Sequence, residues 1–318
     1  MKRRNLSLTF ILLAFALCSC GGGASPEAAD ETVRIGAMKG ATAIGLAKYI
    51  EDAPDGVSFE VVTADEIVPL LVRGGIDMAA VPANLAATLY NNTDGAIRVA
   101  AVNLLGLNYI VETGGEIQSV GDLRGKTVVA VGKGTTPEIT LRHILTQNGL
   151  DPGKDVTLEF RNEPGEVVAW LKQNGGAAML PQPFVTTAMD NVEGLREALD
   201  LTVEWDKLGS PGTLVTGVFV VRASFIEEYP EMVRRVMESY CISLNWVNDY
   251  PAEAAPFVEK LGIASADVAE RAIPKCHLVF LEGAEMRETL EAFYSVLFEA
   301  APGSIGGAMP DDGFYYVP

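Results

Sequence analysis

The feature that most constrains this chain is an alternation of short apolar runs with segments of helical period, and the whole series occurs twice. The first series has expected strands at 33–38, 58–62 and 78–81, and expected helices at 42–50, 66–72 and 85–90. The second has expected strands at 127–131, 156–160 and 177–180, and expected helices at 137–147, at 166–173 and from 184. Strands that alternate with helices in this way predict α/β structure, with mainly parallel sheets flanked by crossover helices.

The recurrence extends to individual residues. Residues 66–82 match residues 166–183 with one insertion, and both end in a glycine pair, a methionine and a proline. The loop Lys39-Gly40-Ala41-Thr42 likewise matches Lys133-Gly134-Thr135-Thr136. Helix period and glycine C-caps explain the apolar spacing and the paired glycines in any strand-helix unit. They do not explain two Lys-Gly-x-Thr loops and two prolines in the same order, so the pattern predicts two homologous lobes.

The lobe boundaries follow from the repeat. We expect the first lobe to comprise residues 32–112 and 222–318, and the second to comprise residues 118–216. The hinges then fall near 113–117 and 217–221, because the long apolar strand expected at 213–221 carries the chain back. Amphipathic segments at 231–249, 251–261 and 285–300 are expected to pad the first lobe. Two crossings between the lobes favour hinge motion over independent tumbling.

The amino terminus has the pattern of a bacterial lipoprotein signal. Residues 2–4 are basic, and residues 6–17 are apolar apart from one serine and one threonine. Twelve helical residues rise about 18 Å and cannot cross a hydrocarbon core of about 30 Å. Residues 1–19 therefore read as a signal peptide, with Cys20 as the lipidated residue and residues 20–31 as a lipid-anchored linker. An ordinary secreted protein with an incidental cysteine is the alternative.

The net charge limits the possible binding partners, and the cysteines allow one possible disulfide. The net charge is −18 with a pI near 4.5, so nucleic acid is a poor partner. A disulfide between Cys241 and Cys276 is permitted outside the cytoplasm, and two free buried thiols are the alternative.

Two matching loops are the first candidate site. Ligands of open parallel sheets sit beyond the carboxyl ends of the strands, where loops lead into helices. In each loop a glycine lets a ligand approach the backbone, and a threonine can cap the next helix. Two helix amino ends that face one cleft would hold a carboxylate, sulfonate, phosphate or carbonyl oxygen. The candidate ligand-binding residues here are Lys39, Gly40, Ala41, Thr42, Gly134, Thr135 and Thr136. The alternative for Lys39 and Lys133 is a position in water.

A second pair of loops follows the prolines. Neutral hydrogen bonds can come from Asn84 and Gln182, and an apolar wall from Phe184. Thr216 and Gly217 are expected near the cleft floor, and Asn108 and Tyr109 near the outward crossing. With their neighbours, these further candidates are Pro82, Ala83, Asn84, Asn108, Tyr109, Gln182, Pro183, Phe184, Thr216 and Gly217.

The sequence contains no motif typical of a catalytic or a metal-binding site. The two histidines, His143 and His277, are far apart, and neither the Gly-x-Ser-x-Gly nor the His-Glu-x-x-His motif occurs. Residues 132–136 lack the spacing of a phosphate loop. We therefore expect no catalytic residues, no metal and no cofactor.

The motifs resemble those of the substrate-binding lipoproteins of ABC transporters, in the branch related to nitrate, sulfonate, taurine and thiamine-pyrimidine binding proteins. The resemblance lies in residues 39–45, in the Arg73-Gly74-Gly75-x-Asp77 step and the rest of 73–84, in 123–128 and in 305–316. It implies a two-lobed type II periplasmic-binding-protein fold with a cleft between the lobes. It also implies capture of one small solute by lobe closure and delivery to an ABC permease and ATPase.

The resemblance leaves the ligand open between a sulfonate, taurine or nitrate class and a pyrimidine-like class. It implies a monomer that is not an enzyme, anchored outside the cytoplasm by its lipid alone. A pyrimidine-synthase-like enzyme is one alternative, which turnover lost on changing His143 or His277 would support. A sensor or interaction lipoprotein is the other, which a genome neighbourhood without permease and ATPase genes would favour.

Overall fold

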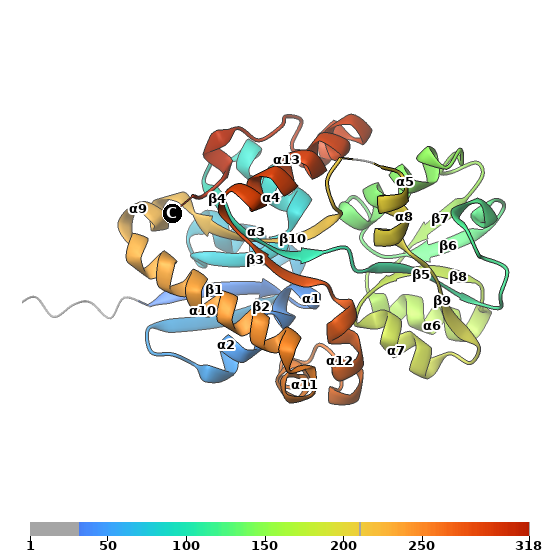
Figure 1. The fold of residues 1–318 in the computed structure, drawn as a ribbon, viewed down its shortest axis with the longest axis horizontal. Coiled ribbons are helices and arrows are strands. Elements are labelled where there is room, and N and C mark those ends of the chain that lie inside the picture. The colour runs from blue at the N-terminus through green and yellow to red at the C-terminus, as the bar shows by residue number, and fades with distance from the viewer. Residues whose placement is uncertain (1–31, 210, 318) are drawn as a thin grey trace, which may run out of the picture. The chain divides into compact units, whose positions relative to one another are not determined.

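The computed structural model describes residues 32–209 and 211–317 and contains two β-sheets flanked by helices (Figure 1). The expected signal peptide (1–19), the linker (20–31) and Cys20 lie outside the described residues. No helix within the described residues combines the length and the hydropathy that a transmembrane span needs.

The first sheet has six strands in the order β11-β4-β10-β3-β1-β2. Its strands are β1 (Val33–Met38), β2 (Val57–Val62), β3 (Met78–Pro82), β4 (Ile97–Leu105), β10 (Val215–Arg222) and β11 (Leu278–Leu281). Strands β1, β2 and β3 are parallel, whereas β10 runs antiparallel to β3 and β4. Strand β11 is antiparallel to β4 at the edge.

The second sheet has five strands in the order β7-β6-β8-β5-β9. Its strands are β5 (Asn108–Thr113), β6 (Thr127–Ala130), β7 (Thr157–Phe160), β8 (Ala177–Pro181) and β9 (Leu195–Asp200). Strands β6, β7 and β8 are parallel, and β5 is antiparallel to β8 and β9. The predicted pair of mainly parallel sheets is confirmed, although β4, β5, β9 and β11 are not among the expected strands.

Strand pairing divides the chain differently from the expected lobes. Residues up to 112 are expected in the first lobe, whereas the whole of β5 pairs in the second sheet. A hinge is expected near 217–221, whereas these residues lie inside the first sheet, with Gly217 opposite Pro82. The reason is that each crossing strand completes its hydrogen bonds in one sheet. The outward link between the sheets is therefore only Gly106-Leu107, whereas the return link spans residues 201–214 and includes α8 (Leu201–Lys207).

Helices cover both faces of the sheets. The helices are α1 (Ala41–Ile44), α2 (Ala47–Asp52), α3 (Ala64–Arg73), α4 (Ala83–Asn92), α5 (Thr136–Gln147), α6 (Pro164–Asn174), α7 (Phe184–Asn191), α8 (Leu201–Lys207), α9 (Ala223–Glu228), α10 (Pro230–Asp249), α11 (Pro251–Lys260), α12 (Ala266–Ala272) and α13 (Gly283–Ala300). The single helix expected at 42–50 is divided into α1 and α2. A Cβ at Gly45, between them, would lie 3.3 Å from Leu244 Cδ1 of α10, so α10 packs closely against this point of the chain.

Three clusters of buried side chains form the core. One cluster lies between the first sheet and α2, α10 and α11, and includes Leu46, Phe219 and Tyr240. A second covers one face of the second sheet. The third runs through both sheets, from Ile67 of α3 to Trp205 of α8 and Phe293 of α13. The two lobes therefore share apolar contacts beyond the strands that connect them.

Candidate functional site

The four candidate loops lie at the carboxyl ends of parallel strands. Residues 39–42 follow β1, and residues 83–84 follow β3 in the first sheet. Residues 132–136 follow β6, and residues 182–184 follow β8 in the second. Since parallel strands present their carboxyl ends at one edge of a sheet, each lobe brings its two loops to one edge.

The first Lys-Gly loop is built differently from the prediction. Helix α1 begins at Ala41, and its N-cap is Gly40, whose φ of 137° favours glycine. The Thr42 hydroxyl lies within the helix and donates to the carbonyl of Met38 at 2.7 Å. The prediction that Thr42 can cap the following helix is therefore wrong, because the chain turns two residues earlier.

The second Lys-Gly loop leads into the twelve-residue helix α5. Its N-cap is Thr135, one residue before the threonine that matches Thr42, and Pro137 lies in the first turn, where a proline is favoured. The Thr135 hydroxyl nevertheless donates backwards to Gly132 O at 2.6 Å and caps no amide. The Gly134 amide donates instead to the Glu138 carboxylate at 2.7 Å, so an acidic side chain already occupies part of this helix end.

The amino ends of α4 and α5 meet through two buried side chains. The Asn84 Oδ1 accepts hydrogen bonds from the Thr136 hydroxyl at 2.9 Å and from the Thr136 amide at 3.3 Å. The Asn84 side chain also donates to Ser304 O at 3.4 Å. Two of the predicted site residues, 52 positions apart, thus join helices that belong to different sheets.

Gln182 occupies the loop after β8. Its side chain is 1% exposed, and its Oε1 accepts from the Thr186 hydroxyl at 2.9 Å and from the Thr186 amide at 3.4 Å. The backbone amide of Gln182 donates to Leu107 O at 3.0 Å, and its Nε2 has no protein partner. Pro183 is buried beside it, and Phe184 packs on the apolar cluster of the second sheet.

Asn108 and Tyr109 lie on β5 beside this loop. Asn108 is 4% exposed and pairs with Pro181. The Tyr109 hydroxyl donates to Lys275 O at 3.4 Å. Burial, together with the carboxylates of Asp200 and Glu197, raises the pKa of Tyr109. Both residues are therefore close to the predicted loop and buried.

Strand β10 passes beside the same region. Gly217 lies opposite Pro82 on one side and Leu104 on the other. A Cβ at Gly217 would lie 2.8 Å from Asn103 Oδ1, so the neighbouring strand leaves no room for a side chain. The Thr216 Oγ1 is buried without a protein partner. Asn103 is a neighbour that the sequence analysis missed, because nothing in its local pattern distinguishes it from other strand residues.

The lysines of the two loops are exposed. A Cβ at Gly262 would lie 3.8 Å from the Lys39 Nζ, which places that ammonium beside the turn after α11. Lys133 is exposed at the start of the second loop. The fully buried polar and charged residues in the described part of the chain include no lysine and no arginine.

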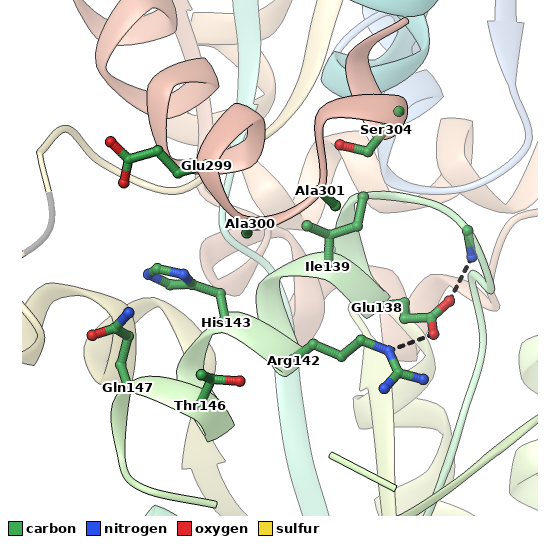
Figure 2. Close-up of a pocket in the computed structure, with 12 residues that line it drawn as sticks. Glu138, Ile139, Arg142, His143, Thr146, Gln147, Glu299, Ala300, Ala301 and Ser304 are labelled. Atoms are coloured by element: carbon green, nitrogen blue, oxygen red, sulfur yellow. Dashed lines mark hydrogen bonds and ion pairs between the residues drawn. The ribbon is translucent and has the colours of Figure 1, made fainter. Parts of the chain in front are cut away.

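A cavity of about 690 Å³ lies between α5 and the end of α13 (Figure 2). Arg142 points back to Glu138, with Nε 2.7 Å from Oε1, and His143 points to the opposite end. Burial lowers the pKa of His143, and the nearby Glu299 carboxylate opposes that shift. The other histidine, His277, uses its Nδ1 to contact Gly106 O.

The two cysteines of the described chain are free, so the permitted disulfide is not formed. Cys241 is half-buried on α10, whereas Cys276 is fully buried, which raises the pKa of its thiol to about 12. Across residues 32–209 and 211–317, no three His, Cys, Asp or Glu side chains gather in a way that would hold a metal ion.

Comparisons with known proteins identify a matching family and several solved structures with a similar fold. The profile of the NMT1-like family matches residues 60–262. No curated protein is significantly similar in sequence. Among solved structures, an ABC transporter protein from Parabacteroides distasonis is 24% identical, with a TM-score of 0.76, over 91% of this chain and 99% of that one.

Two further solved structures have the same fold. The periplasmic aliphatic sulphonate binding protein SsuA from Escherichia coli is 17% identical with a TM-score of 0.73, over 91% of this chain and 93% of that one. The periplasmic nitrate-binding protein NrtA from Synechocystis PCC 6803 is 16% identical with a TM-score of 0.60, over 86% of this chain and 84% of that one. The expected two-lobed periplasmic-binding fold is confirmed, and the family match covers more than half of the sequence. The chain belongs to the NMT1-like family.

Proposed function

We propose that this protein is the solute-binding component of an ABC importer, and that it captures a small organic solute by closing two lobes. The supporting observation is the meeting of α4 and α5, whose amino ends come from different sheets and join through Asn84 and Thr136. The fold shared with the sulphonate- and nitrate-binding proteins agrees with this role. Loops at the strand carboxyl ends supply the binding groups.

The remaining parts of the proposal concern anchoring and partners. Acylated Cys20 would hold the protein outside the cytoplasm as a monomer, with residues 20–31 as the tether. A permease and an ATPase would receive the solute. The lobes would move about the two links at which the chain leaves one sheet and enters the other, which are residues 106–107 between β4 and β5 and residues 201–214 between β9 and β10.

Ligand-induced closure is the first prediction. Small-angle scattering is expected to report a smaller radius of gyration when a binding solute is added, and the solute is expected to raise the melting temperature. A ligand at 100 times its Kd stabilises the folded state by about 2.7 kcal/mol. The protein is unfolded and refolded first, so that any carried-over solute is removed before anions, sulfonates, pyrimidines and amines are screened.

Variants test the loops. The double change Thr42→Ala and Thr136→Ala removes the two hydroxyls that hold the loops, one donating to Met38 O and the other to Asn84 Oδ1. Each lost hydrogen bond costs about 1 kcal/mol, so the solute has to order two looser loops and its Kd is expected to rise at least tenfold. The matched control is Thr157→Ala on the exposed edge strand β7, for which Kd stays unchanged. An unaltered affinity in the double variant would reject these loops as the binding site.

A further inference from the structure

Buried polar atoms without a protein partner are concentrated at the junction of the two sheets. In the described part of the chain, eight buried side-chain atoms lack a hydrogen-bond partner, and five of them lie around residues 103–108. We call these five residues the crossing cluster: Asn103, Asn108, Gln182, Thr202 and Thr216.

Backbone and side-chain contacts place these residues together. Thr202 lies beside the link, because a Cβ at Gly106 would come within 2.1 Å of its Oγ1. Gln182 follows Pro181, the residue that pairs with Asn108. Asn103 lies against Gly217, and Thr216 precedes that glycine on β10. The cluster therefore surrounds one short segment of chain at the carboxyl-end loops.

The free atoms have defined chemistry. Gln182 Oε1 accepts from the Thr186 backbone amide, which can only donate, so the unpartnered Gln182 atom is the Nε2 donor. Asn108 presents an oxygen acceptor, and Thr216 presents a hydroxyl that can donate or accept. Gln182 and Asn108 are 1% and 4% exposed, so both are screened from bulk water.

Burying a polar atom without a hydrogen-bond partner lowers the stability of the folded protein. A buried donor or acceptor left unsatisfied costs about 1–3 kcal/mol, and most buried polar groups in folded proteins have a partner. Five at one place indicate that a polar occupant, either a ligand or ordered water, completes the cluster.

The surroundings of the cluster disfavour an anion. All five side chains are neutral, and the fully buried residues in the described chain include no lysine or arginine. The carboxylate of Asp200 lies next to the cluster and accepts from the Thr202 amide at 2.8 Å. At the second loop, Glu138 already takes the Gly134 amide. An anionic ligand at the cluster would thus meet the Asn108 oxygen and the nearby Asp200 carboxylate, with no buried lysine or arginine to balance its charge.

We propose that the solute is an uncharged polar molecule that carries a hydrogen-bond acceptor next to a donor, of the amide, ureide or amino-heterocycle class. Its acceptor binds Gln182 Nε2, and its donor binds Asn108 Oδ1. This inference rests on the proposed function, and it separates this chain from the sulphonate- and nitrate-binding proteins that share its fold.

The test is a thermal-shift and calorimetry panel with the refolded wild-type protein. The neutral probes are uracil, cytosine, nicotinamide, urea and allantoin, and the anionic probes are nitrate and methanesulfonate. At least one neutral probe is expected to bind, with no shift from the anions. Binding of an anion but of no neutral probe overturns the inference and leaves the proposed function standing. Binding of none overturns both.

Two variants locate the bound probe. Gln182→Met removes the Nε2 donor at similar volume, together with the oxygen that accepts from Thr186, and is expected to raise Kd at least tenfold. Gln173→Met, on the exposed face of α6, leaves Kd unchanged. A wild-type Kd in folded Gln182→Met would contradict the assignment.

Thr216→Val gives a readout that does not depend on loss of folding. It replaces an unpartnered hydroxyl by a methyl group in a strand, so the ligand-free melting temperature is expected to rise by about 2 °C while the probe binds more weakly. Thr157→Val on β7 controls for strand propensity. If Thr216→Val lowers the ligand-free melting temperature and leaves Kd unchanged, ordered water alone completes the cluster and the inference fails.

Discussion

At the scale of single residues, one buried aspartate ties three strands of the first sheet. Asp77 is 2% exposed and accepts from the Arg34 backbone amide at 3.0 Å and from the Arg34 guanidinium at 2.7 and 2.9 Å. Arg222, at the end of β10, donates to the same carboxylate at 2.9 Å. The Arg-Gly-Gly-x-Asp step in the sequence is therefore structural in this chain, because its carboxylate holds strands together at the edge opposite the candidate loops.

Removing this carboxylate is expected to destabilise the fold. Asp77→Ala leaves two guanidinium groups without their shared partner, and both are partly solvated, so we expect a loss of about 2 kcal/mol in the free energy of unfolding. Urea denaturation at pH 7 measures it. Asp52→Ala removes only the exposed pair with Lys48 and is expected to cost less than about 0.5 kcal/mol. Equal losses in the two variants would contradict this role.

At the scale of elements, α5, α8 and α13 pack around one tryptophan. Trp205 of α8 is fully buried, and its ring centre lies 5.2 Å from that of His143 on α5 and 5.9 Å from that of Phe293 on α13. Its indole nitrogen donates to Gly212 O at 3.1 Å. The packing around Trp205 joins α5 and α8 of the second lobe to α13, the last long helix of the chain. It also leaves the imidazole ring of His143 half-buried.

The lowered pKa of His143 predicts a pH dependence. Well above about pH 6.5 the ring is neutral in both the folded and the unfolded chain, so it contributes nothing to the pH dependence of the free energy of unfolding. As the pH falls below that value, the unfolded chain takes up the proton first, so the folded state loses stability. NMR titration is expected to give a midpoint below that of the urea-unfolded protein. His143→Gln is expected to lose less melting temperature between pH 7.5 and 5 than the wild type. A folded midpoint at or above the unfolded one would refute the burial argument.

At the scale of the whole described unit, the two sheets have corresponding strand orders. From β2 to β4 the first sheet runs β2-β1-β3-β10-β4, and the second runs β7-β6-β8-β5-β9, each with its antiparallel strand in fourth place. The antiparallel strand of each sheet enters from the other lobe, since β5 follows β4 and β10 follows β9. This arrangement makes each lobe depend on the other for its sheet.

Ion pairs between elements of the two lobes would make the proposed closure sensitive to salt. Arg271 of α12 pairs with Asp190 of α7 through both carboxylate oxygens, and Lys275 pairs with Glu197 of β9 at 2.5 Å. Both pairs are partly exposed, so each contributes at most about 1 kcal/mol.

Arg271→Gln is therefore expected to shift the ratio of closed to open ligand-free molecules by up to about fivefold towards open. Scattering at 20 mM salt would detect a larger radius of gyration than in the wild type, and the difference is expected to vanish near 1 M salt. Arg234→Gln is the control, because Arg234 pairs only with Glu231 and Glu238 of its own helix. No difference at low salt would mean that the pair does not favour closure.

The sequence by itself determined the elements and their duplication. Strand and helix periods follow from local backbone geometry, so β1, β3, β6 and β8, their loops, and Pro137 in the first turn of α5 were all predictable. The repeat of the Lys-Gly-x-Thr loops indicated two lobes, because local backbone geometry does not require the same loop twice in the same order.

Only the tertiary structure decided which of these loops meet. Residues 108–112 of β5 were expected in the first lobe and pair in the second sheet, whereas residues 215–216 of β10 were expected in the second lobe and belong to the first sheet. The Thr42 hydroxyl donates to Met38 O instead of capping a helix. The contact of Asn84 with Thr136 and the crowding of neutral groups around residues 103–108 join segments that are distant in the chain. Local periodicity carries no information on such pairs, because their proximity depends on how complete sheets and helices pack against each other.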